Sequence, residues 1–295
     1  MELHSIPVTV TLNLVFMMLR VSVTFVLMIA ALLINIIFLV FPVSYGVLVS
    51  FYEVSATRPF AESFTFNNYI YILNVYGYIM IRTIGMSLLL TVLLIVLSLP
   101  VAYFMAIKIR SDRVKTLLLF FMLIPFWIDW SARMMAWHPV LGEQGFINYL
   151  LRQFGLQPVK IMFTSYAVMI AWVQTYILFM ITPIYLSLLK MDPVIISAAE
   201  TLGANRLQVL YHIIFKMSLP GIVVGSIYTF VMSLSDYATP AIVGGGYVTL
   251  GAVIASLAAF LKWPLAMALA VVQVSLILVF VFIALKAVDI RRMLF

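Results

Sequence analysis

Long apolar stretches recur along the whole chain and are separated by shorter polar segments. Four of these stretches contain no charged residue, apart from Lys286 at the end of the last one. A membrane-spanning helix needs about 20 apolar residues, because the hydrocarbon core is about 30 Å thick and a helix rises about 1.5 Å per residue. The pattern therefore predicts four transmembrane helices, at residues 22–49, 83–107, 165–188 and 263–286.

Two further stretches predict spans that carry unusual residues. Residues 116–137 are apolar but contain Pro125, Asp129 and Arg133, and a charge at the centre of a span costs about 2.5–3.5 kcal/mol on insertion scales. This helix is therefore expected to kink or to face protein and water instead of lipid. Residues 217–236 predict another span, with Pro220 expected in its first turn, where a missing N–H costs little.

A seventh apolar stretch, residues 247–261, is expected not to cross the membrane, because it is only about 15 residues long and follows a run of glycines. Lysine and arginine mark the cytoplasmic side of membrane proteins. With six spans and a cytoplasmic N-terminus, eleven of the seventeen basic residues fall on that side: Arg20, Lys108, Arg110, Arg113, Lys115, Lys190, Arg206, Lys216, Lys286, Arg291 and Arg292. We therefore predict an all-α polytopic membrane protein with one transmembrane domain over residues 1–295, six helices and both termini in the cytoplasm.

The composition agrees with this class and narrows the chemistry. Hydrophobic residues make up 65% of the chain and charged residues 9%, whereas soluble domains are about 45–50% apolar and about 25% charged. The net charge of +7 comes from basic residues beside the apolar spans, so membrane topology explains it and nucleic-acid binding is not expected. The lack of cysteine and the scattering of the three histidines predict no metal site.

The longest predicted cytoplasmic loop, residues 190–216, carries a helical pattern of its own. Asp192 and Pro193 are typical of a helix start, because aspartate accepts hydrogen bonds from free backbone N–H groups and proline suits the first helical position. Gly203 is expected to turn the chain between two short amphipathic helices. Such an exposed apolar helix pair indicates a protein partner. The alternative is that the helices lie on the bilayer or pack beneath their own bundle.

This loop resembles the cytoplasmic EAA loop of binding-protein-dependent ABC importers. Four positions match its EAAxxxG motif and the isoleucine that follows: Ala198, Ala199, Gly203 and Ile213. Ser197 stands where a glutamate is usual, and Phe215 and Lys216 stand where leucine and proline are usual. The resemblance implies that these residues form the coupling helix, which docks into a groove of the ATPase subunit, without the ion pair that the glutamate would make.

Three other segments resemble the spermidine/putrescine class of these permeases: LIPFW at 123–127, KIMFT at 160–164 and SDYATPAIVGG at 235–245. The resemblance runs from about Phe38 to Leu285 and implies the type I ABC importer permease fold in a bacterial inner membrane. It also implies a second permease subunit, expected to be a different chain, two ATPase subunits that bind ATP and magnesium, and an extracytoplasmic solute-binding protein. This chain itself is expected to bind no cofactor and to catalyse no reaction.

A polyamine solute needs separated carboxylates for its ammonium groups and aromatic faces for its methylenes. Six residues are candidates for such a solute pathway: Trp127, Asp129, Trp130, Arg133, Asp236 and Tyr237. Asp129 and Arg133 share a helix face, so a structural ion pair, or a contact with the binding protein, is the alternative for them. Asp236 is an ionisable group at predicted membrane depth, which favours a functional role.

Other functions are still open at this point. Relatives of this permease class also transport opines, amino acids, phosphonates and ferric iron. The sequence therefore narrows the solute only to a small polar compound. A stand-alone channel or secondary transporter is the alternative from another class, and its expected sign is a pair of broken helices in corresponding halves. No GxxxxGK[ST], HExxH or GxSxG pattern occurs in the sequence, so an enzyme is not predicted.

Overall fold

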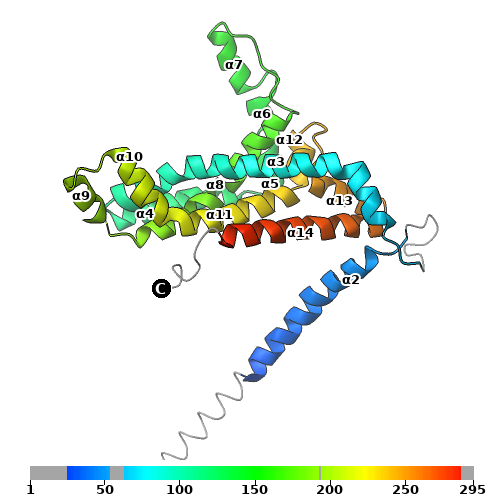
Figure 1. The fold of residues 1–295 in the computed structure, drawn as a ribbon. Helices are drawn as coiled ribbons and strands as arrows, with labels where there is room; N and C mark the ends of the chain where they lie inside the picture. Colours follow the sequence, from blue (N-terminus) through cyan, green and yellow to red (C-terminus); the bar gives the residue numbers. More distant parts are fainter. Residues whose placement is uncertain (1–24, 54–62, 193, 287–295) are drawn as a thin grey trace, which may run out of the picture.

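Helices and turns form the protein over residues 25–53, 63–192 and 194–286, the residues that the computed structural model describes. The predicted all-α class is confirmed for these residues, whose only β-structure is an isolated bridge between Tyr52 and Phe64. Four long helices run side by side along one axis (Figure 1): α3 (Asn67–Tyr103), α8 (Ser165–Leu189), α11 (Phe215–Ser235) and α14 (Trp263–Lys286).

The core lies where α3, α8 and α11 pack against one another. Gly221 of α11 lies so close to α8 that a Cβ atom on it would be 2.2 Å from the carbonyl oxygen of Pro183. Membrane helices associate through small residues of this kind, because lipid tails compete for apolar contacts and close backbone packing is the remaining gain. Trp172 of α8 is fully buried in the same core.

The first helix, Phe25–Val49, leaves the bundle at an angle (Figure 1). It is apolar on all sides, contains a π-helical turn at Ile36–Val40, and ends in α2 (Phe41–Val49), which contacts α14. Residues 22–24 of the predicted first span lie outside the described residues, as do both chain termini. The predicted orientation of the termini therefore stays a prediction.

The second helix differs from its predicted bounds, because α3 begins at Asn67 and not near residue 83. Arg82, which suggested a boundary, lies within the helix. Its guanidinium donates a hydrogen bond of 2.6 Å to the carbonyl of Val248 and lies 4.3 Å from the centroid of the Tyr247 ring. These two contacts compensate the charge, so the helix continues past it.

The predicted span 116–137 is not one continuous helix. Helix α4 (Asp112–Leu123) passes into a 3₁₀ turn at Ile124–Trp127, and α5 (Trp130–Met135) then starts in a new direction. The segments on either side of this break are bent by 93°. Proline in the turn and an aspartate cap on the next helix explain why the predicted kink is a full break.

The fifth span also differs, because residues Arg206–Ser235 form one helix that includes α10 (Arg206–Val209), a π-helical turn at Leu210–Ile214 and α11. The prediction that Pro220 lies in the first turn is wrong, because Pro220 lies inside α11. Lys216 stands where the EAA loop usually has proline, so nothing ends the helix there. The N–H that Pro220 lacks would have bonded to the carbonyl of Lys216, four residues earlier in the same helix.

Short helices lie at both ends and on one side of the bundle (Figure 1). Helix α9 (Val194–Thr201) and α10 lie at one end, while α12 (Ala238–Val243) and α13 (Leu250–Ala259) lie at the other. The predicted stretch 247–261 thus holds only the short helix α13. Helices α6 (His138–Leu141) and α7 (Phe146–Gln153) form an arm that projects away from the bundle.

Candidate functional site

Asp129 sits at the break between α4 and α5. Its carboxylate accepts a hydrogen bond of 3.1 Å from the backbone N–H of Ala132 and thereby caps α5. Among the described residues, Asp129 and Arg133 form no ion pair; the only ion pair there joins Lys115 and Asp112. The predicted structural pair is therefore wrong, because the aspartate side chain turns back to its own helix start. The Asp129 side chain stays exposed to the surroundings of the bundle.

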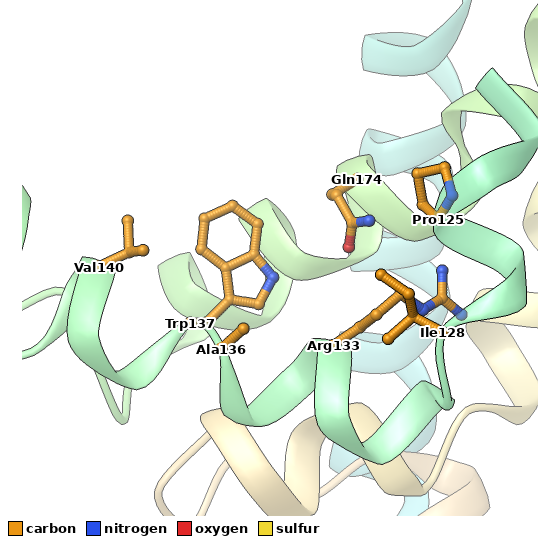
Figure 2. A pocket seen from close by; sticks show the side chains of 7 residues that line it. All are labelled: Pro125, Ile128, Arg133, Ala136, Trp137, Val140 and Gln174. Carbon is orange, nitrogen blue, oxygen red and sulfur yellow. The ribbon is translucent and has the colours of Figure 1, made fainter. Parts of the chain in front are cut away.

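Arg133 instead points into a pocket of about 300 Å³ between α5 and α8 (Figure 2). Its guanidinium carbon lies 5.2 Å from the centroid of the Phe126 ring. The Nε and Nη1 atoms are buried and have no hydrogen-bond partner, and the same holds for the Oε1 atom of Gln174 across the pocket. The remaining lining is apolar: Pro125, Ile128, Ala136, Trp137 and Val140.

Aromatic rings continue from this pocket across three elements. Phe126 packs edge-on against Phe179 of α8 with 5.5 Å between ring centroids, and Phe179 stacks on Tyr228 of α11 at 6.3 Å. Trp127 lies beside this row, packs edge-on against Phe120 and is 72% exposed. The bend in the span thus places aromatic faces at the pocket and along its flank, where they can contact methylenes or cations.

Asp236 is a buried carboxylate whose hydrogen bonds are made within the chain. One oxygen, Oδ2, accepts from Trp172 Nε1 at 2.8 Å, from the Tyr176 hydroxyl at 3.0 Å and from the Thr239 hydroxyl. The other, Oδ1, accepts from the backbone N–H groups of Ala238 and Thr239, each at 3.0 Å. Five donors surround a side chain that is 8% exposed. In this structure the carboxylate is therefore not free to meet an ammonium group of a solute.

The other predicted pathway residues lie on two elements that the fold brings together. Helix α5, with Trp130 partly buried in the core, packs against α12. Tyr237, at the start of α12, is exposed, in contrast to its neighbour Asp236. Trp127, at the end of the 3₁₀ turn, and Asp129, at the start of α5, are both exposed. The six residues therefore do not form one cage, because Asp236 faces α8 and Arg133 faces a separate pocket.

The predicted coupling residues lie on and beside α9 and α10, at the end of the bundle opposite α12 and α13 (Figure 1), and an apolar surface of other residues lies next to them. Gly203 follows α9 with a φ angle of +89°, a backbone conformation that favours glycine. Leu202, Leu207 and Tyr211 are 88%, 75% and 66% exposed. Ser197 and Ala198 are also exposed, whereas Ala199 and Ile213 pack partly against the core. The expected second short helix is not separate, because it continues into α11.

Two contacts fix this surface to the bundle. Ile196 of α9 is buried in the main core, which holds the short helix against its own bundle. Asn205 caps α10 through a reciprocal pair of bonds with Gln208, at 2.9 Å and 2.8 Å. A capping box of this kind fixes where a helix starts and in which direction it runs. The exposed leucines and Tyr211 are thus presented on a rigid support.

Asn148 is fully buried and holds the projecting arm together through side-chain hydrogen bonds. Its side-chain amide donates to the carbonyls of Gly142 and Val159 at 3.0 Å each, and its oxygen accepts from the Val159 N–H at 2.8 Å. A polar hollow of about 380 Å³ lies against this arm and is lined by Glu143, Arg152 and Lys160, among others. Hydrogen bonds therefore hold the arm in a defined conformation, and its surface carries charged side chains.

Sequence reasoning missed the partners of both ionisable groups. Gln174 is the only amide side chain in α8. The other polar side-chain groups of this helix are hydroxyls and the Trp172 indole. That isolation was a usable signal, because polar side chains inside spans usually face protein or water. Trp172 and Tyr176, four residues apart on one helix face, offer two donors in the direction of a single acceptor. No such acceptor could be assigned from sequence, because it lies 64 residues away.

Comparison with known proteins identifies relatives over most of the chain. The sequence is 33% identical over 185 residues to the spermidine/putrescine transport system permease protein PotB of Escherichia coli (strain K12), covering 62% of this chain and 66% of that relative. It is 30% identical over 205 residues to PotB of Haemophilus influenzae, covering 68% and 71%. The inner membrane ABC transporter permease protein YdcU of Escherichia coli is 26% identical over 179 residues, covering 56% and 57%. The match thus spans slightly less than two thirds of the Escherichia coli PotB. No protein-family model matches the sequence.

Solved structures share the fold over nearly the whole chain. A chain of a bacterial ABC transporter involved in the import of the acidic polysaccharide alginate superposes with a TM-score of 0.71 at 16% identity, covering 92% of this chain and 96% of that one. The same type of transporter in complex with an alginate pentasaccharide-bound periplasmic protein gives a TM-score of 0.68. At such low identity the likeness concerns the fold, and it confirms the predicted importer permease architecture.

Proposed function

Because this chain belongs to the family of ABC importer permeases that includes the spermidine/putrescine permeases, we propose that it is one membrane-spanning subunit of a polyamine importer in the bacterial inner membrane. The similarity to the PotB proteins carries this proposal. The fold supports it, because five apolar helices and one bent pair provide up to six spans. A secondary transporter is not favoured, because the described residues contain one bent span and not two in corresponding halves.

The apolar surface of α9 and α10 supports docking on an ATPase subunit. Leu202, Leu207 and Tyr211 project from a helix pair that a buried side chain and a capping box hold rigid. Exposed apolar side chains on such a support are typical of protein interfaces. We assign the binding of ATP and magnesium to the two ATPase subunits. When these subunits bind ATP, they push on this chain at the turn that contains Gly203. This chain then changes the tilt of its bundle without catalysing a reaction.

The splayed first helix supports the need for a second permease subunit. Its apolar window is 0% buried within this chain, and a helix that is apolar on all sides is stable only in lipid or against another protein. Asn35 lies in its middle, where its amide N–H₂ donates only to the carbonyl of Ala31 at 2.9 Å. An exposed amide at this depth favours a partner helix over lipid. The proposed pathway lies between the two permease subunits.

For the solute, the exposed candidates are the ones that fit. The carboxylate of Asp129 and the rings of Trp127 and Tyr237 are accessible and offer a charge and two aromatic faces to a flexible dication. Asp236 is better explained as the group that holds α8 to the start of α12. The projecting α6–α7 arm is the proposed contact for the extracytoplasmic solute-binding protein, because it stands clear of the bundle and carries charged side chains.

Copurification and transport test this function together. The tagged chain is expressed with its genomic neighbours, purified in mild detergent and reconstituted in lipid with the solute-binding protein. We expect an ATPase subunit in the purified complex and uptake of labelled putrescine or spermidine that requires ATP. If the chain transports alone, the proposed mechanism is wrong. If the assembled complex imports another solute but neither polyamine, the proposed solute is wrong.

A further inference from the structure

Arg133 places a positive charge inside the bundle without a counter-charge. Its Nε and Nη1 atoms are shielded and lack hydrogen-bond partners, and the carbonyl oxygen of Gln174 lacks a partner in the same pocket. Phe126 lies against the guanidinium, so the N–H edge is the part that still needs an acceptor. Buried polar groups are nearly always paired in folded proteins. Gln174 Oε1 can offer this edge a neutral acceptor but no counter-charge, so the guanidinium charge is unpaired among the described residues.

The described part of this chain does not supply a counter-charge for Arg133. Asp129, one turn before Arg133, caps its own helix. Asp236 is bound to Trp172 and Tyr176, which share one face of α8 because they are four residues apart. Gln174 lies between them in sequence and faces the opposite side, since each residue advances about 100° around a helix. The two sites are thus separated by the body of α8.

The depth of the pocket argues against a lipid headgroup. Gln174 lies nine residues from Ser165, where α8 begins, which is about 14 Å along the helix axis. Half of the hydrocarbon core is about 15 Å thick, so if α8 enters the hydrocarbon at Ser165, Gln174 and the guanidinium facing it are near the middle of the bilayer. An unpaired charge is costly there, and intramembrane charges pair with one another or face protein. The acceptor must reach the pocket at mid-membrane.

Under the proposed function the solute is a cation, and a guanidinium repels it. This inference rests on that function. We propose that the Arg133–Gln174 pocket receives the carboxylate of an aspartate or glutamate from the second permease subunit. A planar guanidinium binds a carboxylate through two parallel hydrogen bonds. The apolar walls formed by Ile128, Ala136 and Trp137 exclude water from the pair and fix its geometry. The contact joins the break in the bent span directly to the neighbouring subunit.

Cross-linking in the assembled complex tests the position of the partner. A photoreactive amino acid replaces Ile128, which lines the pocket and is 52% exposed, and the same group replaces Leu89 of α3, which is 57% exposed, as the control. We expect Ile128 to give a covalent product with the second permease subunit, in larger yield than Leu89. A product with lipid or with the binding protein alone, or equal yield at both positions, overturns the proposal. Arg133 is intact in both variants.

Charge exchange then tests the chemistry. We expect Arg133→Gln to lower the amount of second permease that copurifies, Arg133→Lys to retain more of it, and Arg133→Glu to retain least. The cross-link identifies acidic residues of the neighbour, and changing the right one to lysine is expected to restore assembly of the Arg133→Glu chain. Arg113→Gln on α4, an exposed arginine, is the matched control and should assemble like the wild type.

Two results separate this inference from the proposed function. If the wild-type complex contains the ATPase and imports polyamine, yet Arg133→Gln assembles normally and changes only the KM for solute, Arg133 acts on the solute and not on the neighbouring subunit, and the inference is wrong. If Arg133→Gln alters neither assembly nor transport, the pocket has no such ligand and the inference is again wrong. If wild-type complex never forms with an ATPase, the proposed function itself fails.

Discussion

The indole Nε1 of Trp172 donates a hydrogen bond of 2.8 Å to the carboxylate of Asp236, although 64 residues separate them in the sequence. The bond links the middle of α8 to the point where α11 ends and α12 begins. Tyr176 adds a second donor from the same helix face at 3.0 Å. The carboxylate thus fixes the start of α12, which packs against α5, the helix that follows the break in the bent span.

Removing this carboxylate should loosen the bundle. We expect Asp236→Ala to destabilise the purified complex by about 1–3 kcal/mol for each donor left buried without a partner, and Trp172→Phe to cost less because one donor is lost together with its partner bond. Thermal unfolding in detergent measures both, with the exposed Trp127→Phe as the control. Unchanged stability together with a raised KM for polyamine would instead assign Asp236 to the solute.

Asp129 allows its charge to be separated from its capping role. Asparagine caps helices about as well as aspartate, whereas alanine costs about 0.5–2 kcal/mol. We therefore expect Asp129→Asn to keep the stability of the complex and to raise the KM for putrescine uptake, because the ammonium loses its counter-charge. Asp129→Ala should lower both stability and uptake. Wild-type kinetics in the asparagine variant, measured with labelled solute, would show that the solute does not contact this carboxylate.

Gly221 tests the close packing of α11 on α8. An added Cβ atom would lie 2.2 Å from the Pro183 carbonyl oxygen and 2.6 Å from the Ile184 Cα atom, and a backbone cannot yield as a side chain does. We expect Gly221→Ala to destabilise the bundle by about 1–3 kcal/mol, as overpacked cores do. Gly77→Ala in α3 is the matched control, because nothing lies within 4 Å of the added atom. Equal unfolding temperatures for the two variants would contradict the helix contact.

Gly203 tests the coupling surface. Its φ of +89° is disfavoured for a β-branched residue, and a left-handed backbone costs about 1–2 kcal/mol for residues with a side chain. That cost corresponds to a fall of roughly 5–30-fold in the population of the docked turn. We expect Gly203→Val to reduce uptake per ATP hydrolysed while expression and membrane insertion are kept. The ratio of uptake to hydrolysis in proteoliposomes measures this, with Gly77→Val as the control. An unchanged ratio would rule out the coupling role of this turn.

The sequence predicts well which segments form membrane-spanning helices, because length and hydropathy alone decide whether a segment can cross a bilayer. Arg82 shows where that rule fails: a charge predicted the start of a span, but a carbonyl and the Tyr247 ring compensate it within α3. Pro220 shows a second failure, because the helix begins well before it, at Arg206, and the proline lies inside α11 instead of in a first turn. Local residue preferences do not contain such tertiary contacts.

The sequence yields candidate residues for the solute pathway but not their arrangement in space. The sequence places six residues in one pathway. In the structure, however, Asp129 caps its own helix instead of pairing with Arg133, and Asp236 is bound to Trp172 of α8, apart from both. Pairing at a spacing of four residues assumes a continuous helix, and the break at residues 128–129 removes that assumption. Gly203 was predicted correctly as a turn, because its positive φ follows from a local rule and not from distant contacts.

Solute-stimulated ATP hydrolysis tests the central claim most directly. The complex of this chain, its second permease and the ATPase subunits is reconstituted in lipid, and hydrolysis is measured with binding protein loaded with putrescine, spermidine, an opine, an amino acid or a phosphonate. The account predicts stimulation by putrescine or spermidine and little by the other solutes. Stimulation by one of the other classes alone would contradict the polyamine assignment, and hydrolysis that no loaded binding protein stimulates would contradict the importer assignment.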